Sequence, residues 1–339
     1  SWDRPSITIT AYARNPASGR FVHPEQDRGL SVREAAILQS FPNYYMFDGP
    51  FDSKFSQIGN AVPPRFASFI AGYLVGELAS SIQFPLSYQG IEVSKPITNS
   101  YSSKIASSKM NRISNANIKP TAVDAFCGAG GLSLGLQRAG FAVQLSYDSN
   151  QIAVETYRKN LGDQVILADA NQIDISGRLR KKQKTDLTLF AGGPPCQGFS
   201  VQRRGADADS RNLLVELFFS QAMQIRPHFI LMENVLGIAG RRGNDLLQEI
   251  SHLCTESGYY CHTKVLNAAD FGVPQIRRRM LLVAERICNG GLFFEFPSPV
   301  LTQDSWKTVW DAISDLPPTP RNGTEYVRIP NHRSDRMTD

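Results

Sequence analysis

The sequence predicts an α/β fold in which helices cover both faces of a mostly parallel sheet. Two observations on residues 120–285 lead to this prediction. Short apolar runs alternate with longer helical patterns, as they do in chains of β-α-β units. Glycines or polar residues directly follow several of the apolar runs, which is where ligands bind in open parallel sheets. We therefore expect a binding site at the carboxyl ends of these strands.

The expected elements follow one another along the chain. Residues 121–126 form a short buried strand, and a helix then runs from Gly130 to Ala139, where Gly140 ends it. The later strands are short apolar runs, and the later helices are longer segments with an apolar face. These strands are 142–147, 187–191, 228–232 and 279–284, and the helices are 151–160, 212–225 and 246–257.

The two segments before this region differ in character. In residues 1–79, a helical pattern covers 31–41, residues 57–64 look loop-like, and a helix with an apolar face covers 65–78. Residues 80–119 are rich in Ser, Asn and Lys and show little apolar periodicity. This composition is typical of a linker.

Composition limits the class of protein. Hydrophobic residues make up 42% and charged residues 20% of the chain, as in ordinary globular proteins. No run of about 18 apolar residues occurs, so we expect no membrane span. The net charge of +5 permits a polyanionic partner such as nucleic acid without requiring one.

Cysteine usage indicates a reducing compartment. The five cysteines form no CxxC pair, which disfavours a disulfide framework and a zinc site, and we expect no bound metal. An intracellular location fits, in the cytoplasm or nucleoid, or in the nucleus of a eukaryote. The chain starts at Ser1 without a methionine, so we expect both of its ends to be cuts through a longer protein.

Three features of residues 126–169 are typical of a site for a nucleotide-like cofactor. The sequence FCGAGG at 126–131 joins a strand to a helix, where glycines let a ligand approach the backbone. Asp148 ends the second strand, where a carboxylate can bind a ribose diol. Asp169 follows an apolar run and can accept a hydrogen bond from an adenine amino group. A role as helix cap or turn residue explains each aspartate equally well.

Two further residues stand at strand ends. Cys196 lies in GGPPCQGFS at 192–200, a loop that prolines stiffen. A cysteine there can be activated as a thiolate, although most free cysteines are small buried hydrophobes. Glu233 follows an apolar strand, where a carboxylate is costly unless it is hydrogen-bonded or functional.

The last expected strand begins among polar residues. Gln275, Arg277 and Arg279 alternate along it and point to one face. A functional set and a solvated basic strip are both consistent with this pattern.

Together these motifs resemble the DNA cytosine carbon-5 methyltransferases. FxGxGG from Phe126, PCQ from Pro195, ENV from Glu233 and QxRxR from Gln275 resemble family motifs I, IV, VI and VIII, in the family's order. Residues 28–42 resemble motif IX, and residues 57–63 resemble motif X. Each motif is weak evidence by itself, but the six together are specific.

The resemblance implies a Rossmann-like, S-adenosylmethionine-dependent methyltransferase that acts on a cytosine flipped out of double-stranded DNA. The Cys196 thiolate adds to carbon 6 of the ring, and Glu233 donates to ring N3. Arg279 binds ring O2, and Arg277 supports the site. The cofactor gives its methyl group to carbon 5 and leaves as S-adenosylhomocysteine. Family analogy also points to bacterial or phage restriction-modification.

The resemblance assigns further residues to the two ligands. The cofactor-binding residues are Phe126, Gly128, Ala129, Gly130, Gly131, Asp148, Ser149, Asp169, Pro195, Asn60, Ala61 and Val62. The DNA-binding residues are Gln197, Ser200, Arg203 and Gln275. Ser149 stands where an apolar or aromatic residue often covers the adenine, so we expect modestly weaker cofactor binding.

The motif order departs from the family, in which motifs IX and X come last. The chain therefore resembles a circular permutant, although two tandem enzymes cut into one fragment would give the same order. On this interpretation residues 1–79 hold motifs IX and X, 80–119 are a linker, 120–285 are the catalytic and cofactor-binding core, and 286–339 lead into the target-recognition region. A full recognition domain is missing from both ends. We expect a second chain or a missing segment to supply it, unless the domain is very small.

Three other functions remain open. An RNA cytosine methyltransferase of the same fold would carry a Cys-Phe-Thr motif, which this sequence lacks. A non-catalytic DNA-binding regulator would be expected to lose Cys196 or Glu233. An NAD-type oxidoreductase would explain neither PCQ nor ENV.

Overall fold

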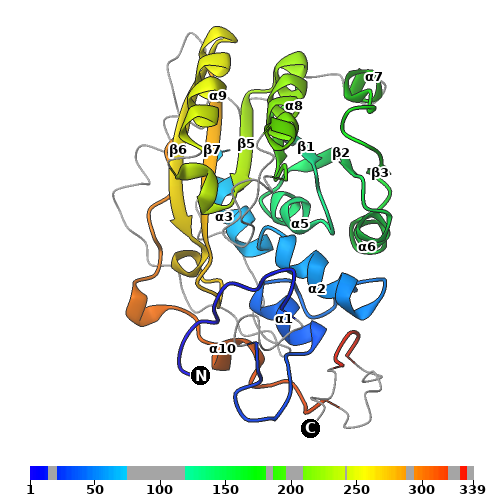
Figure 1. The fold of residues 1–339 in the computed structure, drawn as a ribbon, viewed down its shortest axis with the longest axis vertical. Helices are drawn as coiled ribbons and strands as arrows, with labels where there is room; N and C mark the ends of the chain where they lie inside the picture. Colours follow the sequence, from blue (N-terminus) through cyan, green and yellow to red (C-terminus); the bar gives the residue numbers. More distant parts are fainter. Residues whose placement is uncertain are drawn as a thin grey trace.

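The computed structural model describes residues 1–13, 21–74, 119–180, 186–195, 209–240, 243–287, 294–319 and 329–333. At its centre is a seven-stranded sheet with the order β3-β2-β1-β4-β5-β7-β6 (Figure 1). The strands are β1 (Thr121–Ala125), β2 (Ala142–Asp148), β3 (Val165–Leu167), β4 (Leu189–Gly192), β5 (Phe229–Asn234), β6 (Tyr259–Asn267) and β7 (Arg278–Arg286). Strands β1 to β5 are parallel, and β7 is antiparallel to both of its neighbours. The predicted α/β fold with a mostly parallel sheet is confirmed.

The strand order reverses beside β1. This strand pairs with β2 on one side and with β4 on the other. The chain therefore builds the sheet outward to β3 and then returns to extend it in the opposite direction. In open sheets of this kind, ligands bind at the carboxyl ends next to the reversal. The segments after β1 and β4 both leave the sheet at this edge, because the two strands are parallel neighbours.

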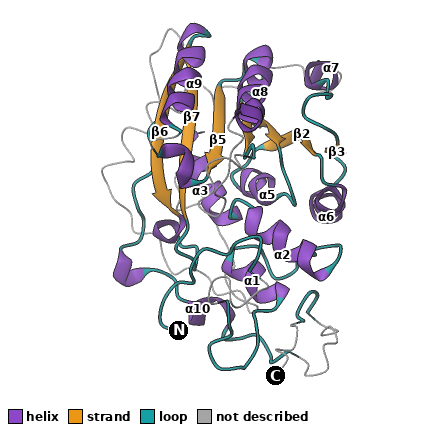
Figure 2. Ribbon diagram, in the orientation of Figure 1, coloured by secondary structure: helices purple, strands orange, loops and turns teal. Residues whose placement is uncertain are grey.

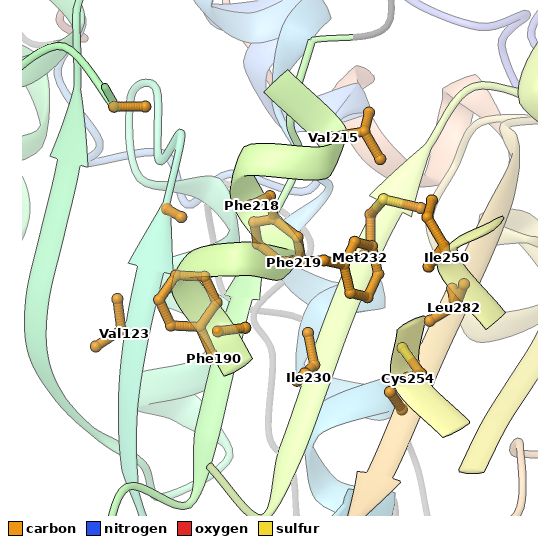
Figure 3. Close-up of a cluster of buried hydrophobic side chains, with 14 of the residues drawn as sticks. Val123, Phe190, Val215, Phe218, Phe219, Ile230, Met232, Ile250, Cys254 and Leu282 are labelled. Atoms are coloured by element: carbon orange, nitrogen blue, oxygen red, sulfur yellow. The ribbon is translucent and has the colours of Figure 1, made fainter. Parts of the chain in front are cut away.

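Helices cover both faces of the sheet (Figure 2). One face carries α7 (Ile175–Arg180), α8 (Asp209–Ile225) and α9 (Asn244–Glu256), and the other carries α3 (Pro64–Leu74), α5 (Gly131–Arg138) and α6 (Gln151–Leu161). On the first face, Phe218 of α8 packs against Phe190 of β4 with ring centroids 5.1 Å apart (Figure 3). Among the described helices, none is both long enough and apolar enough to cross a membrane.

Helix α3 lies far from α5 in the sequence but packs directly against it. A Cβ atom built on Gly135 of α5 would lie only 2.3 Å from Ala67 Cβ, so the absence of a side chain allows this approach. Ser68 Oγ also donates a hydrogen bond to Gly135 O at 3.0 Å. The apolar residues of α3 share one buried cluster with residues of β1, β4 and β7. Helix α3 thus completes the helical layer on this face.

The segment after β7 returns to the beginning of the chain. Helix α10 (Val309–Ile313) packs near α1 (Val32–Leu38) in one buried cluster. Val309 N donates to Arg4 O at 2.9 Å. Ser31 Oγ lies 3.0 Å from His332 Nδ1, which joins the start of α1 to the last described segment.

The structure corrects the expectation of a loop at residues 57–64. Residues 57–60 are the last turn of α2 (Phe51–Asn60). A Cβ on Gly59 would lie 2.1 Å from the backbone of Thr10, so this glycine within the helix permits close packing. Strand β6 was not expected from the sequence either. The predicted linker lies almost wholly outside the described residues, as does the predicted end of the helix at 75–78.

Candidate active site

Glu233 and Arg279 form an ion pair at the end of β5. Arg279 Nε lies 3.0 Å from Glu233 Oε1, and both side chains are largely buried, with 13% and 11% of their surface exposed. The two groups are close enough for an ion pair but are not aligned for a hydrogen bond. Glu233 Oε1 is buried and accepts no hydrogen bond from any described residue. Arg279 Nη1 is held by Arg278 O at 2.9 Å. The acid therefore keeps bonding capacity for a ligand.

The segment that leads to Cys196 lies against this carboxylate. Asn234 Nδ2 donates to Pro194 O at 3.2 Å, and Asn234 Oδ1 accepts from Val235 N at 2.8 Å. A Cβ built on Gly193 would lie 3.6 Å from Glu233 Oε2, at ordinary van der Waals distance, so this glycine lies directly beside the carboxylate. Asn234 was not assigned a role from the sequence, although its place next to a carboxylate at a strand end was a usable signal.

Four of the predicted functional residues lie outside the described part of the chain. They are Cys196, Gln197, Ser200 and Arg203. Cys196 follows Pro195 directly in the sequence, and Pro195 is the last described residue of the loop after β4.

Arg277 faces the protein interior rather than the ligand side. Its guanidinium donates to Ile9 O at 2.9 Å, to Gly59 O at 2.9 Å and to Ala61 O at 3.0 Å. It is only 2% exposed, and burial lowers its pKa. Arg277 therefore clamps the N-terminal segment to the sheet, which agrees with a supporting role and not with contact to a base.

Gln275 is a correction to the predicted DNA contacts. Its side chain is 0% exposed. Gln275 Oε1 accepts from Ile9 N at 2.8 Å, and Nε2 donates to Leu38 O and to Gln39 Oε1. The carboxamide is thus fully engaged within the protein. The three side chains predicted to share one face do not do so. Gln275 and Arg277 point into the protein interior, whereas Arg279 points toward Glu233.

The loop between β1 and α5 uses its glycines in two ways. A Cβ on Gly130 would lie 2.6 Å from Leu161 Cδ1, and one on Gly131 would lie 2.4 Å from Val62 O, so these glycines permit packing. Gly128 has a φ of +51°, and nothing lies within 4 Å of the position its Cβ would occupy. Phe126 is also left-handed, with φ +55°, which is uncommon for a bulky residue. The side of Gly128 where a Cβ would project is therefore open space within the described residues.

Asp148 holds this loop from the neighbouring strand. Its Oδ2 accepts from Gly128 N at 2.8 Å, and its Oδ1 accepts from Asn150 N at 2.8 Å. Burial raises the pKa of Asp148, and these backbone hydrogen bonds oppose that change. Ser149, the next residue, is exposed. An ionised carboxylate can accept more than two hydrogen bonds, so the side chain can also bind a ligand hydroxyl.

Asp169 lies just beyond the neighbouring strand end. Leu167, the last residue of β3, pairs with Asp148. Asp169 Oδ1 accepts from Asn171 N at 2.8 Å and from Asn171 Nδ2 at 2.9 Å, and these bonds lower its pKa. The two predicted carboxylates and the open glycine therefore share one edge of the sheet.

The structure brings the predicted segment from Asn60 to Val62 to the same loop. Val62 O faces Gly131, as described above, while Ala61 O accepts hydrogen bonds from Gln39 Nε2 at 2.9 Å and from Arg277. The Asn60 side chain is exposed and lies 3.4 Å from Ser56 Oγ. Tyr45 had no predicted role. Its hydroxyl donates a hydrogen bond to Ala129 O at 2.5 Å and so stabilises the loop between β1 and α5.

A comparison with protein families matches most of the chain. The family model described as C-5 cytosine-specific DNA methylase matches residues 2–75 and 121–335. These ranges contain all the described parts of the candidate active site.

Comparisons with individual proteins find bacterial relatives. The chain is 38% identical over 219 residues to the Type II methyltransferase M1.HphI of Haemophilus parahaemolyticus, covering 63% of this chain and 57% of that protein. It is 36% identical over 205 residues to the Type II methyltransferase M.XorII of Xanthomonas oryzae pv. oryzae, covering 59% and 47%. It is 33% identical over 242 residues to the Type II methyltransferase M.AquIA of Picosynechococcus sp., covering 63% and 96%. The chain spans about half the length of the first two relatives.

Proposed function

This chain belongs to the family of C-5 cytosine-specific DNA methylases, and from that premise we propose that it transfers a methyl group from S-adenosylmethionine to carbon 5 of a cytosine in double-stranded DNA. The observation that carries the proposal is the buried pair of Glu233 and Arg279, 3.0 Å apart, beside the segment that leads to Cys196. The three relatives described above are named Type II methyltransferases, so we assign the activity to restriction-modification within the cell.

The residues around Gly128 fit the cofactor. The open space at Gly128 lets a ligand reach the loop backbone, as a bulky nucleoside requires. Asp148 at the end of β2 is suited to the ribose hydroxyls, and Asp169 beyond β3 to the adenine amino group. The remaining residues of the proposed cofactor site are Phe126, Ala129, Gly130, Gly131, Ser149, Pro195, Asn60, Ala61 and Val62. When bound, S-adenosylmethionine supplies an electrophilic methyl group, and S-adenosylhomocysteine is released.

The protein's own residues make cytosine carbon 5 nucleophilic. The Cys196 thiolate forms a bond to carbon 6, and the electron pair of the 5,6 double bond is displaced into the ring. Glu233 donates a proton to N3, so negative charge does not accumulate on the base. Arg279 binds O2 and holds the ring against Glu233. After methylation a base removes the carbon-5 proton, the double bond re-forms, and the Cys196 sulfur leaves as a thiolate.

Arg277 acts as a positioning residue in this proposal. It holds Gly59 and Ala61 in place, and these residues lie next to the proposed cofactor-binding Asn60 and Val62. Arg279, two residues along the chain, holds the catalytic carboxylate. One stretch of backbone therefore supports both ligand sites.

We propose that the chain is a circular permutant of its family. The close packing of α3 against α5 supports this, because motif X then lies beside motif I within one chain. Joining neighbouring ends of a fold in a new order is generally tolerated. We also propose that a second chain supplies a recognition region near α10 and the first residues, which contact each other.

The experiment is to trap the covalent adduct. The protein is incubated with S-adenosylmethionine and a mixed-sequence DNA duplex that contains 5-fluorocytosine, and the denatured product is weighed by mass spectrometry. We expect an adduct that disappears in Cys196→Ser. A matched RNA duplex tests the RNA alternative, since an adduct with RNA alone would overturn DNA as the substrate. Binding of S-adenosylmethionine without any adduct would show that the recognition region must be added.

A further inference from the structure

Gln221 is a buried amide that joins two separate parts of the cofactor edge. It projects from α8 and is 7% exposed. Tyr147 OH donates to Gln221 Oε1 at 2.6 Å, and Gln221 Nε2 donates to Ala170 O at 2.7 Å. Both of its hydrogen-bonding ends are therefore occupied, and the amide cannot turn over without losing both bonds.

Each partner of Gln221 is next to a carboxylate of the proposed cofactor site. Tyr147 directly precedes Asp148 in β2, and Ala170 directly follows Asp169. Tyr147 is 0% exposed and packs in the same buried cluster as α8. Because side chains alternate along a strand, Asp148 projects to the opposite face. Gln221 thus acts from behind the sheet and cannot touch the cofactor.

The contacts of Gln221 fix the distance between the two strand ends. Beyond the β3 pairing, Ala168 N donates to Asp148 O at 3.0 Å, but the chain then leaves the strand. The Ala170 carbonyl is held from α8 after that point. Asp169 lies between these two anchors, and its exposed side chain has no hydrogen bond to the sheet in the described residues.

We infer that Gln221 is a positioning residue for cofactor binding, which sets the placement of Asp169 relative to Asp148. The inference rests on the proposed function, because these carboxylates matter only if they bind S-adenosylmethionine. Sequence alone gives no signal for it, since Gln221 reads as one polar residue in the helix FFSQA.

The test compares variants that remove these bonds. Gln221→Met keeps the length of the side chain and removes both hydrogen bonds. Tyr147→Phe removes only the hydroxyl and is the milder change if Gln221→Met fails to fold. Tyr259→Phe is the matched control, because Tyr259 is equally buried and its hydroxyl donates one bond of 2.6 Å to Pro227 O at the far edge of the sheet.

Dissociation constants for S-adenosylmethionine are measured by calorimetry, together with DNA affinity and the melting temperature. We expect Gln221→Met to weaken cofactor binding about tenfold, as loss of an outer supporting hydrogen bond does in other sites. Tyr147→Phe should weaken it less, and DNA affinity should stay unchanged in both. Tyr259→Phe should lower the melting temperature and leave cofactor binding intact.

Two results would overturn the inference while leaving the proposed function standing. One is unchanged cofactor binding in Gln221→Met and Tyr147→Phe, and the other is an equal loss in Tyr259→Phe, which would mean a general loss of stability. Failure of the unaltered protein to bind S-adenosylmethionine would instead overturn the proposed function, and the inference with it.

Discussion

Arg277 donates a hydrogen bond to the carbonyl of Gly59 at 2.9 Å, although 218 residues separate the two in the chain. The same guanidinium reaches Ile9 O and Ala61 O. A single buried cation therefore satisfies three backbone acceptors of the N-terminal segment. This relationship holds the predicted motif X segment against the sheet that carries the proposed catalytic residues.

Replacing Arg277 with methionine should destabilise the protein strongly. The change leaves buried carbonyls without donors, and we expect the free energy of unfolding to fall by about 3–5 kcal/mol. Urea unfolding measures the effect. Arg278→Met is the matched control, since Arg278 is exposed and should change stability by less than about 0.5 kcal/mol. Similar losses in the two variants would contradict the clamp.

Glu233→Gln should separate catalysis from binding. The amide keeps the shape of the side chain but cannot donate a carboxyl proton to the base, so we expect adduct formation to slow by about 10²–10⁴-fold. Cofactor affinity should not change. Glu249→Gln on the exposed side of α9 serves as the control for a lost negative charge. A variant of Glu233 that forms the adduct at the normal rate would exclude it as the proton donor.

Two glycines of one loop should respond in opposite ways to alanine. Gly128→Ala places a methyl group in open space, with a strain of about 1 kcal/mol from its positive φ, so the main loss should be in cofactor affinity. Gly131→Ala drives a methyl group against Val62 O, and we expect it to lower stability by about 1–3 kcal/mol. Calorimetry and urea unfolding of both variants give the comparison. The assignment fails if Gly128→Ala binds the cofactor normally.

Asp124 should make stability depend on pH. It is fully buried in β1, its Oδ2 accepts from Ser133 Oγ at 2.6 Å, and burial raises its pKa to about 7. Its Oδ1 is buried and accepts no hydrogen bond from a described residue. In the unfolded chain the pKa is about 3.9.

The sign of the effect follows from these two pKa values. Below pH 4 the carboxyl is neutral in both states, whereas between about pH 4 and 7 only the unfolded chain ionises, so stability falls as pH rises. Asp124→Asn lacks this titration. Between about pH 4 and 7, we expect the free energy of unfolding of the unaltered protein to fall by up to about 4 kcal/mol relative to that of the variant. Above pH 7 the difference between the two free energies should stay constant. Parallel profiles of unfolding free energy against pH would refute the assignment.

The sequence predicts the interior of the fold well because the central strands are buried on both faces. Every residue from Thr121 to Ala125 is buried, and glycines follow soon after. The sequence therefore predicts both that this segment is a strand and where the strand ends. Strand β6 is different. Within the described residues it pairs on one side only, and it exposes residues such as Tyr260 and Lys264, so its sequence carries no clear apolar pattern.

The sequence predicts those residues of the candidate site that directly follow a strand. Glu233, Asp148 and Asp169 follow apolar runs, and parallel strands bring such ends together. Gln275 was misassigned because its partners, Ile9 and Leu38, are distant in the sequence. No local sequence pattern indicates that these segments cover Gln275. The partners of Gln221 are also distant in the sequence, so its role could not be predicted either.

The contacts of Arg277, Gln275 and α3 have a consequence for how the chain is held together. All of them are non-covalent and join the segment before residue 75 to the segment after residue 118. The peptide connection joins these segments covalently, and such a link raises the effective concentration of one segment for the other. Two separately expressed fragments, divided within that connection, are therefore expected to reassemble by complementation at sufficient concentration.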